Sequence, residues 1–194
     1  SRYCAARGVR AVISTNGTRI TEAFAAQYRD LGLSYVGVSL DGLEPTHDRF
    51  RGRAGAFAEA IRGIRICREA GIKVGVRFTM NRLNVRDIPA IFDLLEAEDI
   101  PRACFYHLVY SGRGSKLMEE DLSHAGSRAA LDLIMDRTRS LFDRGNPKEI
   151  LTVDNHADGP YVYLRLLKEG PRRAAEVLEL LKMNEGNSSG HGIG

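Results

Sequence analysis

The sequence contains little cysteine, no long apolar run and no large excess of one charge. Its three cysteines, Cys4, Cys67 and Cys104, are far apart, so they indicate neither a disulfide framework nor a CxxC metal site. We interpret each as a small buried apolar residue. No apolar run reaches the roughly 18 residues that a membrane-spanning helix needs, and no secretory signal is recognisable at the start. These absences favour a protein of the reducing cytoplasm without a membrane partner.

The charged residues exclude another class of partner. The net charge of the 194 residues is only +3, and the basic residues are scattered along the chain. That balance does not predict nucleic acid as a partner, but it is compatible with an anionic small molecule. The length is sufficient for a domain with a sizeable core.

Segments with strand and helix patterns alternate along the chain. The predicted strands are residues 9–15, 34–40, 72–80, 102–110 and 150–155. The predicted helices are residues 22–32, 56–71, 85–99, 127–145, 161–170 and 172–184, with Thr21 and Asn84 as caps of the first and third. This order requires a parallel α/β sheet with right-handed crossovers, either an open doubly wound sheet or an arc of a (β/α) barrel. Both architectures bind ligands at the carboxyl ends of the strands.

Polar residues follow every predicted strand. They are Ser14 to Gly17, then Ser39, Asp41, Gly42, His47 and Arg51, then Thr79, Asn81 and Asn84, then His107, Tyr110 and Ser111 to Gly114, and finally Asp154, Asn155, His156 and Asp158. In a parallel sheet these groups share one edge, which predicts a polar pocket there. Two of them, Arg51 and Arg113, could each bind a carboxylate bidentately.

Each of these residues also has an ordinary structural interpretation. Asn16-Gly17 and Asp41-Gly42 are common turns, Asn84 fits a helix cap, and His107 fits a buried core histidine. The run "SGRGS" lacks the spacing of a phosphate-binding loop. Taken together, these polar residues indicate a functional site more strongly than any one of them alone, because the predicted fold places all of them at one edge of the sheet.

Several segments, taken in order, resemble a known family. "ISTNGT", "VGVSLDG", "THDRFRG", "GIKVGVRFTMNRLN" and "FYHLVYSGRG" resemble the middle of radical SAM enzymes with a C-terminal SPASM or twitch extension. The runs "HLVYSGRG", "LTVDNHADGPYVYLRLL" and "NEGNSSGHGIG" resemble the branch of that family that acts on sirohaem-derived tetrapyrroles.

The resemblance implies a partial (β/α)₆ TIM-like barrel over residues 1–160, and a helical segment over 161–194 that leads to an auxiliary-cluster domain. It implies two cofactors, S-adenosylmethionine (SAM) and a [4Fe–4S] cluster, which generate a 5′-deoxyadenosyl radical. The expected reaction removes or modifies acetate or propionate side chains of an iron tetrapyrrole in haem biosynthesis. The expected electron donor is a ferredoxin or flavodoxin.

The resemblance also assigns residues. Ser39 matches the serine that hydrogen-bonds to SAM, and Arg51 matches the arginine that holds the methionine carboxylate. Asn16 and Asp41 lie beside that cofactor site. The residues assigned to the tetrapyrrole are His107 and Tyr110 as catalytic groups, Arg113 as a partner of a propionate, and His156 as a second candidate ligand, after His107, of the tetrapyrrole iron.

Two motifs of the family are missing, namely CxxxCxxC and the Gly-Gly-Glu strand. We expect them upstream of Ser1, and the auxiliary-cluster cysteines after Gly194, so that this chain is a fragment, inactive by itself and with one sheet edge open to self-association. Two alternatives stay open: a peptide-modifying SPASM enzyme, which shares "SLDG" and "HDxxR", and a non-catalytic α/β binding module. The runs "HLVYSGRG" and "DNHADG" favour the tetrapyrrole branch over the peptide one.

Overall fold

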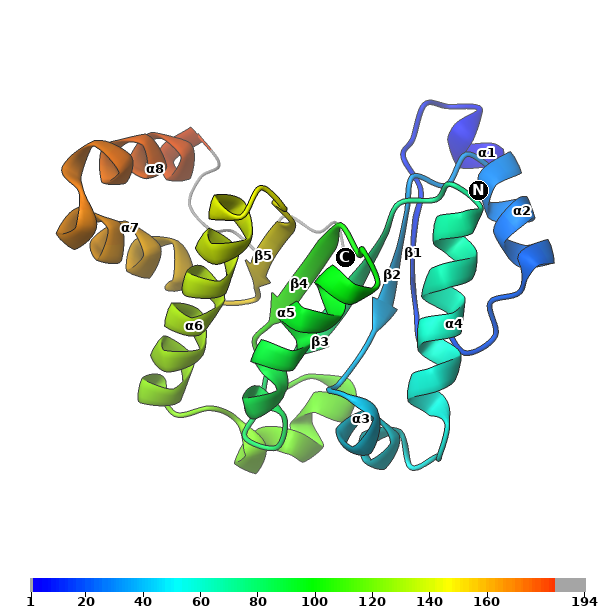
Figure 1. Cartoon of the computed structure of the whole chain (residues 1–194), viewed down its shortest axis with the longest axis horizontal. Coiled ribbons are helices and arrows are strands. Elements are labelled where there is room, and N and C mark those ends of the chain that lie inside the picture. Colours follow the sequence, from blue (N-terminus) through cyan, green and yellow to red (C-terminus); the bar gives the residue numbers. More distant parts are fainter. Residues whose placement is uncertain (1, 184–194) are drawn as a thin grey trace.

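Five strands form one parallel sheet in the computed structural model, which describes residues 2–183 except for the side chain of Arg113 (Figure 1). The strands follow one another across the sheet in chain order. They are β1 (Val12–Thr15), β2 (Tyr35–Ser39), β3 (Val74–Thr79), β4 (Arg102–Tyr106) and β5 (Glu149–Val153). All four neighbouring pairs are parallel, which confirms the predicted class of fold.

Helices connect the strands. They are α1 (Arg2–Ala5), α2 (Glu22–Asp30), α3 (Glu44–Arg51), α4 (Ala56–Glu69), α5 (Ile88–Ala97), α6 (His124–Asp143), α7 (Asp158–Glu169) and α8 (Pro171–Met183), with the 3-10 helices η1 (Val85–Asp87) and η2 (Gly112–Glu120). Figure 1 shows α4, α5 and α6 lying along one face of the sheet, while α3 lies beyond the carboxyl end of β2. No helix within residues 2–183 is long and apolar enough to cross a membrane.

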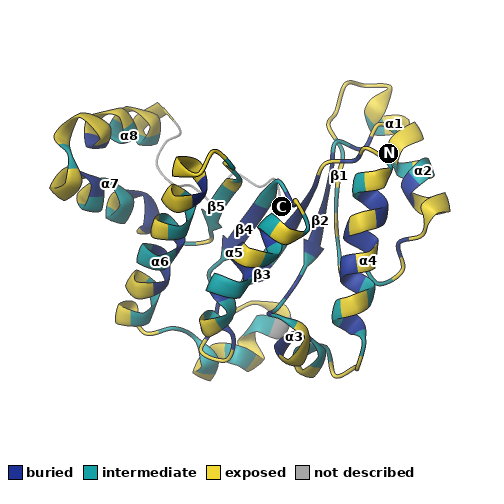
Figure 2. Cartoon of the chain, viewed as in Figure 1, coloured by how far each residue is buried: buried dark blue, intermediate teal, exposed yellow. Residues whose placement is uncertain are grey.

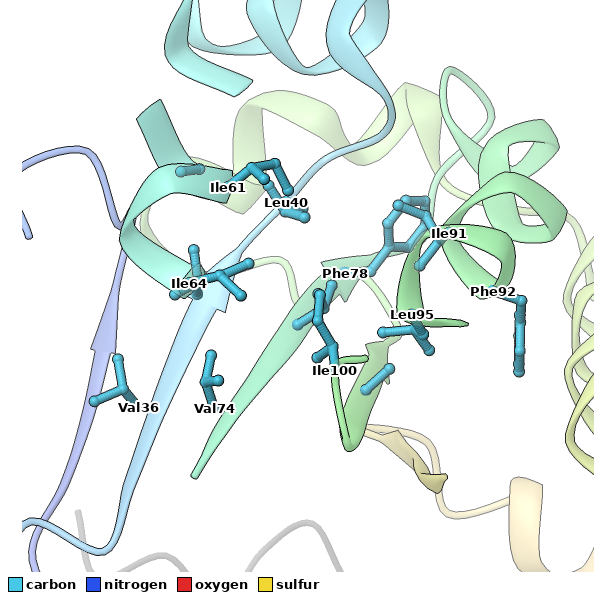
Figure 3. Close-up of a cluster of buried hydrophobic side chains, with 14 of the residues drawn as sticks. Val36, Leu40, Ile61, Ile64, Val74, Phe78, Ile91, Phe92, Leu95 and Ile100 are labelled. Carbon is cyan, nitrogen blue, oxygen red and sulfur yellow. The ribbon is translucent and has the colours of Figure 1, made fainter. Parts of the chain in front are cut away.

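The face of the sheet that packs against these helices forms the hydrophobic core. Val36, Val74 and Phe78 of the strands and Leu40, which directly follows β2, are fully buried. They meet Ile61 and Ile64 of α4 and Ile91, Phe92 and Leu95 of α5 (Figure 3). Figure 2 shows the same division, with buried positions on the strands and on the helix faces turned to them. Burial of this apolar surface fixes the register of every strand, since a slip by one residue would expose it.

The opposite face of the sheet has a different composition. The register places on it Tyr35, Gly37 and Ser39 of β2, Gly75, Arg77 and Thr79 of β3, and Arg102, Cys104 and Tyr106 of β4. Polar and aromatic side chains therefore alternate with the apolar core residues along each strand. In a closed (β/α) barrel this face would turn to the interior.

Two details differ from the sequence-based predictions, and a third agrees with them. Residues 44–51 form helix α3 and not a loop, since Pro45 lies in its first turn and Gly52, with φ of 62°, ends it. The fourth strand ends at Tyr106 and not at 110, and the residues from Gly112 to Glu120 form the 3-10 helix η2. The predicted cap Thr21 is confirmed, because its side chain accepts a hydrogen bond from Phe24 N at 3.3 Å.

Candidate active site at the carboxyl edge of the sheet

A cavity of about 530 Å³ lies at the carboxyl ends of β2 to β5. The side chains that line it include Ser39, Asp41, Arg51, Arg77, Thr79, Asn81, Tyr106, His107 and Asp154. Four strand ends thus contribute to one cavity, as the parallel topology predicts. We call it the carboxyl-edge cavity.

A second hollow of about 630 Å³ adjoins it at Arg51, which lines both. Its other lining residues are Asn16, Thr18, Arg19, His47, Arg53, Ala56 and Glu59. A groove of similar volume lies between α6, α7 and α8, but none of the predicted site residues lines it. The polar residues that follow the strands therefore gather around the first two hollows.

An ion pair between Asp41 and Arg51 forms one wall of the carboxyl-edge cavity. Arg51 Nε lies 2.6 Å from Asp41 Oδ2, in close contact but without the alignment of a hydrogen bond. The two Nη atoms of Arg51 have no hydrogen-bond partner within the part of the chain that the structure describes. The carboxylate thus holds one edge of the guanidinium and leaves the other edge for a ligand.

His47, which is fully buried on α3, fixes the turn that carries Asp41. Its Nδ1 accepts a hydrogen bond from the backbone N–H of Asp41 at 3.0 Å, so the proton of the neutral ring is on Nε2. Burial lowers the pKa of His47 below its usual value, and nearby Arg51 lowers it further, against the opposing effect of Asp41. The imidazole therefore acts as a neutral brace between α3 and the end of β2.

This lowered pKa predicts a pH dependence of stability. Below pH about 6.5 the unfolded chain binds a proton at His47 that the folded protein does not bind. The free energy of unfolding should therefore fall as the pH drops from about 6.5 towards the folded-state pKa, and it should not depend on His47 above that range. In His47→Asn, whose amide oxygen can replace Nδ1 as acceptor, this part of the slope should disappear. Urea unfolding at pH 7.5 and 5.5 measures it, and an equal slope in both proteins would refute the assignment.

Asn84 holds the same turn from the other side. Its Nδ2 donates to the backbone oxygens of Asp41 (3.0 Å) and Thr79 (2.9 Å), and its Oδ1 accepts from Asn81 N (2.9 Å). The side chain is fully buried and makes no cap hydrogen bond. Asn84 therefore lies at the predicted N-cap position, before η1, but its side chain does not cap that helix, because the ends of β2 and β3 use all of its polar atoms.

We expect Asn84→Ala to lower the free energy of unfolding by about 1–3 kcal/mol, since it leaves buried backbone groups without partners. Asn146→Ala is the matched control, because the side chain of Asn146 makes a single hydrogen bond within the described residues, from Nδ2 to Glu96 at 3.4 Å. Chemical denaturation of the complete protein measures both. Equal losses in the two variants would show that Asn84 has no special part in the turn.

His107 follows β4 and forms a pair with a buried carboxylate. Its Nε2 lies 3.0 Å from Oδ2 of Asp158, the first residue of α7, which is only 3% exposed. The backbone N–H of His107 donates to Val153 O at 2.9 Å. A carboxylate on one ring nitrogen orients the imidazole, which is the arrangement that proton transfer by the other ring nitrogen requires.

The structure does not bring all predicted residues together. Ser39, Asp41, Arg51 and His107 line the carboxyl-edge cavity, and Asn16 lines the adjoining hollow, where its Oδ1 accepts from Thr18 N at 3.2 Å. Two others do not line either hollow: His156, which is exposed, and Tyr110, which is half exposed and donates to Asp121. Arg113 lies in η2, and its side chain is outside the described part of the structure, as are residues 184–194 with the run "NSSGHGIG".

Two cavity residues were missed by the sequence analysis. Arg77 and Tyr106 occupy strand positions that read as part of buried apolar runs. The available signal was the alternation in "VGVRFT", where Gly75, Arg77 and Thr79 share one face and the apolar residues share the other. Asp158 was noted among the polar residues after the last strand, but no role was given to it.

Comparisons with known proteins agree with this geometry. Residues 1–95 match the Radical SAM superfamily. The Fe-coproporphyrin III synthase of Methanosarcina barkeri is 66% identical over 192 residues, which are 99% of this chain and 48% of the relative. The pre-heme d1 synthase of Dinoroseobacter shibae is 41% identical over 93% of this chain and 45% of the relative. The chain thus spans about half the length of these curated relatives.

A solved structure shows the same fold. Streptococcus suis SuiB bound to S-adenosylmethionine has a TM-score of 0.64 at 16% identity, over 81% of this chain and 34% of SuiB. The chain belongs to the radical SAM superfamily, and its relatives support the branch that serves haem biosynthesis. The five-stranded sheet is a partial α/β barrel of the radical SAM type, and the family confirms SAM and a [4Fe–4S] cluster as the expected cofactors.

The described residues fit these two cofactors differently. The carboxyl-edge cavity offers a hydroxyl, a guanidinium with a free edge and backbone groups, which suit the polar groups of SAM. Within residues 2–183 no group of three metal-binding side chains exists, and Cys67 and Cys104 are buried in the domain. This part of the chain therefore does not fit an iron–sulfur cluster.

Proposed function

We propose that the complete protein removes acetate side chains from a sirohaem-derived iron tetrapyrrole, with iron coproporphyrin III, which keeps its propionates, as its product. The observation that supports this most is the 66% identity to a protein named Fe-coproporphyrin III synthase across nearly the whole chain, including every strand that borders the carboxyl-edge cavity. SAM, when bound and reduced through the cluster, supplies the radical that abstracts hydrogen from the substrate.

The cofactor lies, in this proposal, against the wall formed by β2 and α3. The Ser39 hydroxyl hydrogen-bonds to the ribose or the methionine part of SAM, and the free edge of Arg51 binds the methionine carboxylate. Asp41 positions Arg51 through their ion pair, while His47 and Asn84 hold the turn that carries Asp41. Asn16 borders the same ligand from the adjoining hollow.

The tetrapyrrole lies on the β4 side of the cavity. Asp158 orients His107 through Nε2, and His107 delivers a proton to the substrate from its other ring nitrogen, Nδ1. Arg113 pairs with a propionate, and Tyr110 and His156 reach the substrate from the loops that follow β4 and β5, His156 as a ligand of the tetrapyrrole iron. We also propose that residues 1–160 form the barrel part and that the protein works in the reducing cytoplasm. A ferredoxin or flavodoxin donates the electrons.

The proposal is tested with the complete protein under anaerobic conditions. It is incubated with SAM, reductant and a sirohaem-derived iron tetrapyrrole whose propionates are intact. Mass spectrometry should show loss of acetate side chains together with formation of 5′-deoxyadenosine. Cleavage of SAM without any change in the mass of the tetrapyrrole would reject the substrate. A precursor peptide offered in parallel tests the alternative, because a mass change of the peptide alone would favour peptide modification.

A further inference from the structure

Arg77 lines the carboxyl-edge cavity but has no part in the site described so far. It is on β3, on the face away from the core, in register with Ser39 of β2 and Cys104 of β4. Its side chain lines the cavity together with Ser39, Arg51 and His107. A cation therefore lies between the wall assigned to SAM and the side assigned to the tetrapyrrole.

The neighbouring strands hold this guanidinium in place. Its Cζ lies 4.4 Å from the centre of the Tyr106 ring, in a cation–π contact. On the other side, Gly37 of β2 makes room for the stem, since a Cβ at that position would lie 2.8 Å from Arg77 Cδ. A guanidinium stacked by its face on a ring keeps the N–H groups at its edges free for hydrogen bonds.

The charge of Arg77 has no ion-pair partner within the described part of the chain. Two other arginines are each paired with a carboxylate: Arg51, which lines the same cavity, with Asp41 at 2.6 Å, and Arg102, on the same face of the sheet, with Glu149 at 3.3 Å. Asp154 lines the same cavity, but it is exposed and forms no ion pair with Arg77. An oriented, partly buried guanidinium without a carboxylate is a binding group for the carboxylate of a ligand.

We propose that Arg77 binds a ligand carboxylate in the carboxyl-edge cavity. The inference rests on the proposed function, which supplies two ligands with that group, namely the methionine carboxylate of SAM and the propionates of the tetrapyrrole. In both cases the planar fork of the guanidinium binds the two carboxylate oxygens, while Tyr106 and Gly37 fix its direction.

The test compares variants and ligands in the complete protein. Binding of SAM, of iron coproporphyrin III and of its methyl ester, which lacks the carboxylate charges, is measured for wild type, Arg77→Gln and Arg77→Lys. The matched control is Arg102→Gln. Arg102 lies on the same face and is also stacked on a tyrosine, Tyr35, at 4.9 Å, but it does not line the cavity. Thermal unfolding checks that each variant is folded. If Arg77→Gln does not fold, the test rests on Arg77→Lys, which keeps the charge but loses the planar fork of the guanidinium.

For Arg77→Gln we expect the affinity for one carboxylate ligand to fall about ten- to hundredfold, with a smaller loss in Arg77→Lys and none in Arg102→Gln. If the preference for the free acid over the ester disappears, the carboxylate belongs to the tetrapyrrole. If SAM binding weakens and the preference stays, it belongs to SAM. Unchanged binding of both ligands would overturn the inference. A wild-type protein that binds neither ligand would instead refute the proposed function.

Discussion

Replacement of His107 by glutamine should lower the turnover of the tetrapyrrole by about 10²- to 10⁴-fold, the usual contribution of general acid–base catalysis. The glutamine amide can still donate to Asp158 Oδ2, so the buried carboxylate keeps a partner and the fold is preserved. It cannot, however, transfer a proton. We therefore expect the affinities for SAM and tetrapyrrole to stay within a few-fold of wild type while the rate of product formation falls.

The control for this variant is His124→Gln, because His124 is exposed at the start of α6 and lines neither hollow. Asp158→Asn gives a second check. It should slow the reaction by about 10- to 100-fold, since Asp158 orients the imidazole of His107 that acts on the substrate. A His107→Gln protein that turns over the tetrapyrrole at the wild-type rate would exclude His107 as a proton donor.

Arg51→Ala should weaken SAM binding by about ten- to hundredfold, because a bidentate hydrogen bond to a charged carboxylate is lost, a change of about 1.5–3 kcal/mol. The variant also leaves Asp41 without its ion-pair partner beside the bound carboxylate, and the repulsion between the two anions adds to the loss. Arg51→Lys should recover only part of the affinity, since lysine has no planar fork.

Arg49→Ala is the matched control for Arg51, because Arg49 lies two residues earlier on α3, is exposed and has no hydrogen-bond or ion-pair partner within the described residues. Equilibrium binding of SAM to the anaerobically reconstituted complete protein measures all three variants. If Arg49→Ala and Arg51→Ala weaken SAM equally, a general loss of positive charge and not a specific contact would explain the effect.

The sequence was sufficient to predict the parallel sheet, because alternating short apolar runs and amphipathic runs leave few other topologies. It also located the site, since the topology brings the residues after the strands to one edge. The sequence was insufficient where the role of a residue depends on a contact with a residue far away along the chain. Asn84 reads as a cap, but it bonds to the backbone of Asp41, 43 residues earlier, and no local pattern reports that contact. Pro45 and Gly52 did mark the ends of α3, but the turn signal of Asp41-Gly42 obscured them.

Arg77 illustrates a second limit. One polar residue in "IKVGVRFTM" does not disturb the apolar character that identifies the strand, so the run reads as buried on both faces. Only the register shows that Arg77 shares a face with Ser39 and that Gly37 leaves space for it. Glycine pairs on adjacent strands, such as Gly37 and Gly75, are a sequence feature that indicates space for long side chains on that face.

A crystal structure of the complete protein with SAM and iron coproporphyrin III would test the location of the site most directly. We expect both ligands in and beside the carboxyl-edge cavity, with the methionine carboxylate within hydrogen-bond distance of Arg51 or Arg77 and the tetrapyrrole next to His107. Ligands bound elsewhere, for example in the groove between α6, α7 and α8, with the carboxyl-edge cavity closed by protein side chains, would contradict the account.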